Sequence, residues 1–259
     1  MAGPGKYLYC IIRCSEERTF DEASPMGGEK APVHTVPYNG LAAVASDSTF
    51  SDGEYAVSRL NMIAHQKVLE TVMPDYTLLP VRFGTVANSA SPIKDIRKLL
   101  EGRFQDFNRL LQEMEGKVEV GLKAFWRNEK AVFEEIVAEN ADIRKLRNSL
   151  SGKPAERIRF DGIPLGRRVK EALDHKRSQE AARILLPLRP AAHRVRENDI
   201  LSDRLIVNAA FLVGKEQEQK FDQAVRRLDE ELGDRVAFKY VGPVPPYNFV
   251  EIVVKWQEL

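Results

Sequence analysis

The sequence predicts an α+β protein of two domains, and three observations support this. The chain has 259 residues, and at about 150 residues per domain two modest domains are expected. The first part of the chain reads as β-β-β-α-β-α-β, and the C-terminal part reads as α-α-β-α-β-β. Strands and helices in such an irregular order favour α+β over a parallel α/β sheet. We therefore expect an N-terminal mixed α+β sheet domain at residues 1–127 and a second α+β domain, preceded by helices, at 128–259.

The strands of the N-terminal domain are predicted from β propensity and turn chemistry. Lys6–Ile12 is a β-prone run, and residues 15–32 form a polar stretch typical of a loop. Val33–Ser48 reads as two strands around the dipeptide Asn39-Gly40, which is common in tight hairpin turns. Leu78–Val86 is expected to form a further strand.

Two helices of this domain are predicted from capping residues and apolar spacing. Ser51 and Glu54 have capping-box spacing. The apolar positions expected behind them are Val57, Leu60, Ala64, Val68, Leu69 and Val72. Ser91 and Pro92 suit the start of a second helix, whose single apolar stripe is expected to run through about six turns to Met114. The alternating segment Lys117–Trp126 should be a strand.

The C-terminal elements follow from the same rules. Helices are expected within 128–150, at Leu165–Leu186 and at Glu216–Leu232, where Gly233 ends the last one. Strands are expected at Asp203–Val213, Arg235–Val241 and Phe249–Val254. A proline-rich turn, 242–247, separates the last two strands. This pattern suits a small three- or four-stranded sheet backed by helices.

Composition excludes several classes of protein. There are 39 basic and 38 acidic side chains and 43% hydrophobic residues, which disfavours intrinsic disorder. No uncharged run is apolar and long enough to span a bilayer, and the N-terminus lacks a signal-peptide pattern, so a soluble cytoplasmic protein is expected. Cys10 and Cys14 are too far apart in a strand for a disulfide, and the four histidines lack metal-ligand spacing. We expect no metal and no cofactor.

No catalytic motif is present, so we expect no enzyme. Arg82 could bind a carboxylate or phosphate, or equally pair with a helix acid. Tyr247 and Phe249 flank the proline-rich turn and could anchor a partner or simply cover a sheet edge. His65 is expected to be hydrogen-bonded and partly buried. The candidate partner-binding residues are therefore Arg82, Tyr247 and Phe249.

Charge is distributed unevenly along the chain. Lys153–Arg196 contains 12 basic and 5 acidic side chains, a net charge of +7. Such a segment could bind nucleic acid or another anionic surface. However, Phe160 is its only aromatic residue, whereas base-stacking platforms are aromatic. A solvated helix face or a docking surface for an acidic protein is favoured, and nucleic-acid or anionic-surface binding is the alternative.

Four segments in order resemble the gas vesicle protein GvpL/GvpF family. They are KYLYCII near the N-terminus, LPVRFGTV, GKVEVGLKAFW and the closing FKYVGPVPPYNFVEIVV. The resemblance extends from Lys6 to about Val254 and is GvpF-like, although these motifs do not separate the F-type from the L-type branch.

This resemblance implies a gas vesicle accessory protein, located at the vesicle or in the cytoplasm and needed for vesicle formation. It implies two α+β domains, the second with a ferredoxin-like sheet. The implied partners are the hydrophobic shell protein GvpA and other Gvp proteins, with no small-molecule substrate and no membrane or nucleic-acid partner. The family provides no catalytic or cofactor-binding residues. Exposed apolar faces of unassembled shell subunits aggregate, so we expect a binder that covers such a face and assists nucleation and assembly.

Overall fold

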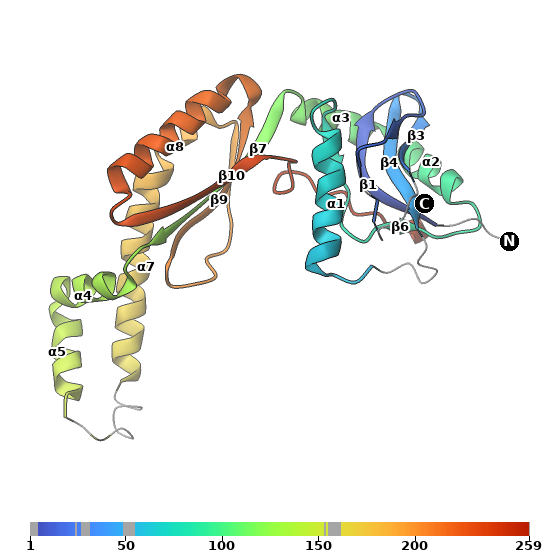
Figure 1. Ribbon diagram of the computed structural model, residues 1–259. Helices are drawn as coiled ribbons and strands as arrows, with labels where there is room; N and C mark the ends of the chain where they lie inside the picture. Colours follow the sequence, from blue (N-terminus) through green and yellow to red (C-terminus); the bar gives the residue numbers. More distant parts are fainter. Residues whose placement is uncertain are drawn as a thin grey trace. The chain divides into compact units, whose positions relative to one another are not determined.

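The computed structural model describes residues 5–23, 25–26, 32–48, 55–152, 154 and 162–258 (Figure 1). It contains helices and antiparallel sheets, so the predicted α+β class is confirmed. Backbone contacts divide the chain into two compact units. Unit 1 contains Met1–Glu119 and Pro243–Leu259, and unit 2 contains Val120–Gly242. Within the described residues, none of the helices combines the length and apolar content that crossing a bilayer requires.

The sheet of unit 1 is built around its first strand. Its members are β1 (Gly5–Arg13), β2 (Thr19–Phe20), β3 (Val33–Tyr38), β4 (Leu41–Ser48), β5 (Leu78–Pro80) and β6 (Val86–Ala87). The order is β2-β3-β4-β1-β5, and β6 also pairs with β1. Because β1 has neighbours on both edges, nearly all of its residues are buried. The predicted hairpin is confirmed: Asn39 and Gly40 have φ of 46° and 86°, as a tight turn with two left-handed residues requires.

Helix α1 (Arg59–Val72) buries only its C-terminal part. Ser58 caps its N-terminus by accepting a hydrogen bond from the backbone N–H of Asn61. The predicted capping pair, Ser51 and Glu54, lies outside the described residues. Val57 and Leu60, which share the apolar spacing identified in the sequence, are each 81% exposed. The inward-facing residues are His65, Val68, Leu69 and Val72.

The helix predicted from Pro92 to Met114 is divided in two. Helix α2 (Pro92–Gly102) and helix α3 (Phe104–Met114) are separated by Arg103, whose φ and ψ of −112° and 20° are not helical. The break lets α2 pack on β3 and β4 while α3 packs on β5 and β1. Arg103 itself lies over the Phe107 ring, 4.8 Å from the ring centroid. The prediction of one continuous stripe was wrong because it took no account of the shape of the sheet.

Two predicted strands are shorter than expected. Leu78–Val86 forms only β5 and β6, because the chain turns between them at Gly84, which has φ of 84°. Phe249–Val254 contributes only one parallel bridge, between Val81 and Ile252. Two backbone hydrogen bonds support this bridge, from Arg82 N to Ile252 O at 2.9 Å and from Ile252 N to Pro80 O at 3.0 Å. The C-terminal segment therefore belongs to unit 1, which differs from the expected division at residues 127 and 128.

Unit 2 contains a four-stranded sheet with helices. Its strands are β7 (Lys117–Trp126), β8 (Arg194–Glu197), β9 (Leu205–Gly214) and β10 (Val236–Val244), in the order β10-β7-β9-β8. Its helices are α4 (Glu129–Glu139), α5 (Ala141–Leu150), α7 (Ile163–Leu185) and α8 (Glu218–Leu232). Short 3₁₀ helices lie at Arg189–Ala191, Lys215–Gln217 and, in unit 1, Trp256–Glu258. Along the chain these elements follow in the order β7-α4-α5-α7-β8-β9-α8-β10.

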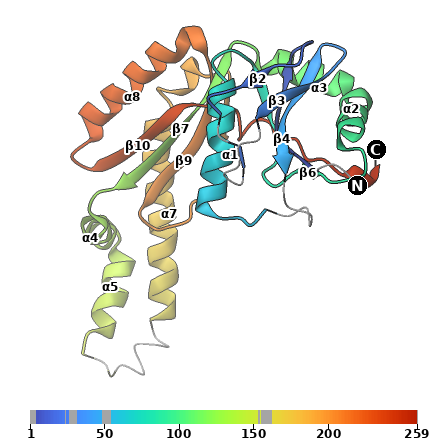
Figure 2. The ribbon, with the colours of Figure 1, turned by 45° about the vertical axis from the view of Figure 1, so that its right-hand side comes forward.

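The helices of unit 2 cover the sheet and also extend beyond it. Trp126, Phe211 and Phe221 are buried where the sheet meets α4, α7 and α8. Helix α5 and the N-terminal half of α7 run side by side, away from the sheet, in both ribbon views (Figure 2). The helical region predicted at 128–150 is interrupted at Asn140, where α4 ends and α5 begins.

Candidate partner-binding surface

A groove of about 360 Å³ lies on unit 1, between α1, the turn after β5 and the C-terminal segment. Met62, His65 and Gln66 contribute from α1. Pro80 to Phe83 and the residues Tyr247, Val250 and Glu251 form the remaining walls. We call this the unit 1 groove. It brings together Arg82 and Tyr247, which are far apart in the sequence, whereas Phe249 does not line it.

Arg82 is held by its backbone while its side chain stays largely in solvent. The bridge to Ile252 fixes the main chain, and the side chain is 64% exposed. Its Nε lies 4.0 Å from Oε1 of Glu251, whose side chain is 63% exposed. An ion pair this long and this exposed contributes little stability. The ion pair of Arg82 is thus made with Glu251 of the C-terminal segment. The exposed guanidinium has further N–H groups that can donate hydrogen bonds to a bound protein.

Tyr247 is positioned by the proline-rich turn. Its backbone N–H donates to Pro245 O at 2.7 Å, and Phe249 N–H donates to Pro246 O at 3.0 Å. The Tyr247 side chain lies in the groove wall and stays partly exposed, at 37% for the residue. Burial of the ring raises the pKa of the Tyr247 hydroxyl, so it remains a neutral hydrogen-bond donor at physiological pH. Phe249 is half-buried beside this turn.

A buried carboxylate anchors the same turn. Glu119 lies in β7 and is only 3% exposed. Its Oε2 accepts the backbone N–H of Asn248 at 2.7 Å, and its Oε1 accepts the Asn248 side-chain amide at 2.6 Å. Hydrogen bonds to a buried charge are stronger than neutral ones. Sequence reasoning missed Glu119, although an acid within an alternating strand is a signal that could have indicated it.

His65 lines the unit 1 groove, and its imidazole is buried and uncharged near pH 7. It is 5% exposed, and its Nδ1 lies 2.9 Å from the Tyr7 hydroxyl. The Gly84 backbone N–H donates to the same hydroxyl oxygen at 3.0 Å, which leaves the Tyr7 proton for His65 Nδ1. Burial lowers the pKa of His65 to about 4, so the imidazole is neutral near pH 7. The predicted hydrogen bonding of His65 is confirmed, and its side chain is more completely buried than the partial burial that we expected.

Large apolar side chains are exposed next to this groove. Val57 and Leu60 are each 81% exposed, Met62 is 52% exposed and Ile63 is 40% exposed. Positions 57, 60 and 63 are three residues apart, so the two that lie in α1 occupy neighbouring turns of one face. We call these four residues the α1 patch. Met62 also lines the unit 1 groove, so the patch and the groove are continuous. Clustered exposed apolar residues mark sites of protein association.

Comparison with known proteins gives this chain a family. Residues 5–251 match the family described as gas vesicle synthesis protein GvpL/GvpF. The chain belongs to this family. Gas vesicle protein F of Microcystis aeruginosa is 31% identical to it over 252 residues, covering 96% of this chain and 99% of the relative. Gas vesicle protein L of a Streptomyces species is 28% identical over 263 residues, covering 95% and 93%.

Solved structures agree with the family assignment. The crystal structure of GvpF from an Anabaena species has a TM-score of 0.79 and 29% identity, and covers 97% of this chain and all 100% of its own. The crystal structure of GvpF from Microcystis aeruginosa has a TM-score of 0.70 and 28% identity, with 96% and 99% covered. The sequence resemblance to GvpL/GvpF is thereby confirmed, and a gas vesicle accessory role follows from the family.

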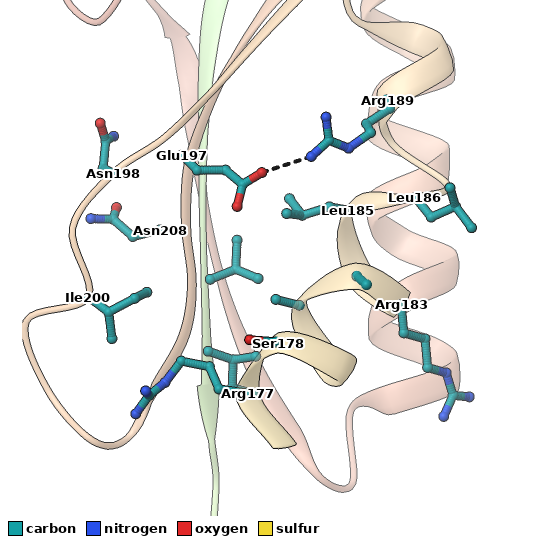
Figure 3. Close-up of a pocket in the computed structure, with 14 residues that line it drawn as sticks. Arg177, Ser178, Arg183, Leu185, Leu186, Arg189, Glu197, Asn198, Ile200 and Asn208 are labelled. Carbon is teal, nitrogen blue, oxygen red and sulfur yellow. Dashed lines mark hydrogen bonds and ion pairs between the residues drawn. The ribbon is translucent and has the colours of Figure 1, made fainter. Parts of the chain in front are cut away.

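This GvpL/GvpF chain has a second groove, of about 530 Å³, on unit 2 between α7 and the strands β8 and β9 (Figure 3). Its arginines come from the predicted basic segment. Arg189 pairs with Glu197 at 2.7 Å, as the dashed line in Figure 3 marks, and Arg183 pairs with Glu231 at 2.6 Å. Arg177 Nε donates to Leu205 O at 2.9 Å. These groups are engaged within unit 2, so this part of the basic segment offers little free charge.

Proposed function

We propose that this protein binds the hydrophobic shell protein GvpA through the α1 patch and the unit 1 groove, and that it acts without catalysis. It would keep the shell protein from aggregating before assembly, aid nucleation of the vesicle, and contact other Gvp proteins there. Family membership supports the accessory role. The observation that carries the proposed surface is the continuous apolar area formed by the α1 patch and the groove.

The physics of shell assembly favours such a surface. An unassembled subunit exposes apolar area that would otherwise associate with other subunits. An apolar face that binds this area lowers the free energy of the soluble complex by about 25 cal/mol for each Å² removed from water. Arg82 and the Tyr247 hydroxyl lie at the same groove and would add directional hydrogen bonds. Binding of this kind is reversible, as delivery to a growing vesicle requires.

The first test removes the apolar character of the patch. We expect Leu60→Ser with Met62→Ser to abolish most of the protein's ability to suppress turbidity of freshly diluted shell protein at equimolar ratio, as measured by light scattering. The matched control is Leu201→Ser, because Leu201 is 84% exposed but lies in unit 2. Equal suppression by the patch variant and the control would remove the α1 patch from the proposal.

The second test addresses the three candidate residues singly. Arg82→Ala and Tyr247→Ala should each weaken binding of the shell protein by about tenfold, because interface arginines and tyrosines commonly contribute this much. Phe249→Ala should weaken it less, because Phe249 does not line the groove. Titration by isothermal calorimetry measures the three affinities. Arg226→Ala, an exposed arginine of unit 2, should leave the affinity unchanged.

We also infer that the two compact units are two domains, with a ferredoxin-like sheet in the second. Each unit has its own apolar cluster of buried residues, which supports this division. The proposed boundaries place the C-terminal segment, from Pro243 onward, with the first domain.

A further inference from the structure

The end of the α5–α7 hairpin is strongly basic. Residues 141–152, 154 and 162–170, as far as the structure describes them, carry six basic side chains and one acidic side chain, a net charge of +5. All six basic residues are exposed, and Lys170 pairs with Asp174 at 3.2 Å. The other five define what we call the hairpin end: Arg144, Lys145, Arg147, Arg167 and Arg168. They lie on the parts of α5 and α7 that extend beyond the sheet (Figure 2).

These charges are not neutralised within the described part of the chain. No acidic group of the described residues lies within ion-pair distance of the five hairpin-end cations. The only side-chain hydrogen bond that one of them makes there joins Arg144 Nη1 to Ala138 O, at 3.2 Å. Further along α7 the pattern is different. Lys176 pairs with Glu135 at 3.1 Å and Arg183 pairs with Glu231 at 2.6 Å, so the same helix changes from paired to unpaired cations along its length.

Most of the apolar side chains of the hairpin pack within unit 2. Ile143 and Leu150 are 3% and 8% exposed, while Leu165 and Val169 pack against the core cluster of unit 2. Helices that lie on a membrane insert a continuous apolar face into the lipid. On this hairpin Ile163, at the start of α7, is the one large apolar side chain of the described residues 141–170 that is mostly exposed, at 67%. The described residues of 141–170 also include no aromatic side chain on which a nucleic-acid base could stack. The described surface of the hairpin therefore offers a partner mainly exposed positive charge.

We propose that the hairpin end binds an acidic, Asp- and Glu-rich segment of a protein partner. Opposite charge accelerates encounter and fixes orientation, and carboxylates accept well-directed hydrogen bonds from arginine. Four of the five hairpin-end residues are arginines, which suits carboxylate recognition. The hairpin end belongs to unit 2 and the α1 patch to unit 1, so we expect the two surfaces to bind different partners.

The test measures binding of a defined acidic probe to the full chain. The probe is a fluorescently labelled poly-L-glutamate of 20 residues, and its anisotropy is followed at low salt. The test variant is Arg144→Gln with Arg167→Gln and Arg168→Gln. The matched control removes the same charge from α8: Lys220→Gln with Arg226→Gln and Arg227→Gln, three exposed residues with no acidic partner among the described residues. Thermal melting establishes that both variants fold.

We expect the hairpin variant to bind the probe about tenfold or more weakly than the parent, because three exposed charge contacts are lost. The α8 control should retain the affinity of the parent. Equal loss in both variants, or no binding by the parent, would overturn the proposal. A single-stranded oligonucleotide of similar charge and vesicles containing phosphatidylserine are tested in parallel. Tighter binding of either one than of the peptide, lost in the hairpin variant, would also overturn it and assign the site to that ligand.

Binding of the shell protein is measured on the same variants. The α1 patch is intact in the hairpin variant and in the α8 control. Both variants should therefore bind the shell protein with the same affinity as the parent. Loss of peptide binding with retained shell binding therefore separates this inference from the proposed function.

Discussion

The imidazole of His65 is buried below the unit 1 groove, among the rings of Tyr7, Tyr9 and Phe83. Burial disfavours its charged form and lowers its pKa to about 4, below the 6.5 of a solvated histidine. A group with a lowered pKa in the folded state binds its proton more tightly when the chain unfolds. The stability that depends on neutral His65 is therefore present above about pH 6.5 and is lost as the pH falls toward 4.

We expect acidification from pH 7 to pH 5 to lower the free energy of unfolding by about 2 kcal/mol through His65 alone. His65→Asn keeps an acceptor for the Tyr7 hydroxyl but does not titrate, so it should lose this part of the pH dependence. Urea unfolding of both proteins at the two pH values measures the difference. An unchanged pH dependence in the variant would show that His65 titrates normally in the folded protein.

At the scale of elements, the proline-rich turn connects the end of β10 with the wall of the unit 1 groove. Pro245 and Pro246 restrict this turn, since each fixes φ and lacks a backbone donor. The carboxylate of Glu119 holds the turn through Asn248. The position of Tyr247 thus depends on a buried charged group that does not itself face the groove.

We expect Asn248→Ala to destabilise the protein by about 1–3 kcal/mol, because it removes a hydrogen bond to the buried Glu119 carboxylate. Thermal unfolding measures the loss. Shell-protein binding should weaken as well, because the turn that carries Tyr247 is less well held. The control is Asn61→Ala, which removes an exposed side-chain hydrogen bond, from Asn61 Nδ2 to Ala56 O at the start of α1, and should cost less. Equal costs would mean that the Glu119 contact contributes no more than an ordinary surface hydrogen bond.

At the scale of the whole molecule, the chain leaves unit 1 after Glu119 and returns to it at Pro243. Unit 2 is therefore a continuous segment, whereas unit 1 is made of two separate stretches. The two units also differ in their exposed chemistry, since the α1 patch is apolar and the hairpin end is basic. We infer that they serve different partners.

Because unit 2 is continuous, the fragment 117–244, which contains all of β7 and β10, should fold without the rest of the chain. We expect a cooperative thermal transition by circular dichroism and burial of Trp126 by fluorescence. Residues 1–127, by contrast, lack the C-terminal segment that pairs with Arg82 and Pro80 and should be less stable than unit 1 in the full chain. A fragment 117–244 without a cooperative transition would contradict the inference of two domains.

Local patterns predicted much of this fold. The hairpin at Asn39-Gly40, the alternating strand β7 and the helix α8 all follow from turn chemistry and periodicity, which depend on neighbouring residues. The exposure of Val57 and Leu60 could not be predicted in this way, because helical spacing identifies a face but not what covers it.

The sequence by itself determined the α+β class, most of the elements and, through four ordered motifs, the gas vesicle family. Only the tertiary structure decided which distant residues share a surface. Arg82 and Tyr247 meet in one groove because Ile252 bridges to Val81, and Phe249 lies outside that groove. The break at Arg103 has the same origin, since α2 and α3 pack on different strands of one sheet. Contacts between residues far apart in the chain depend on the complete packing arrangement, which no local pattern contains.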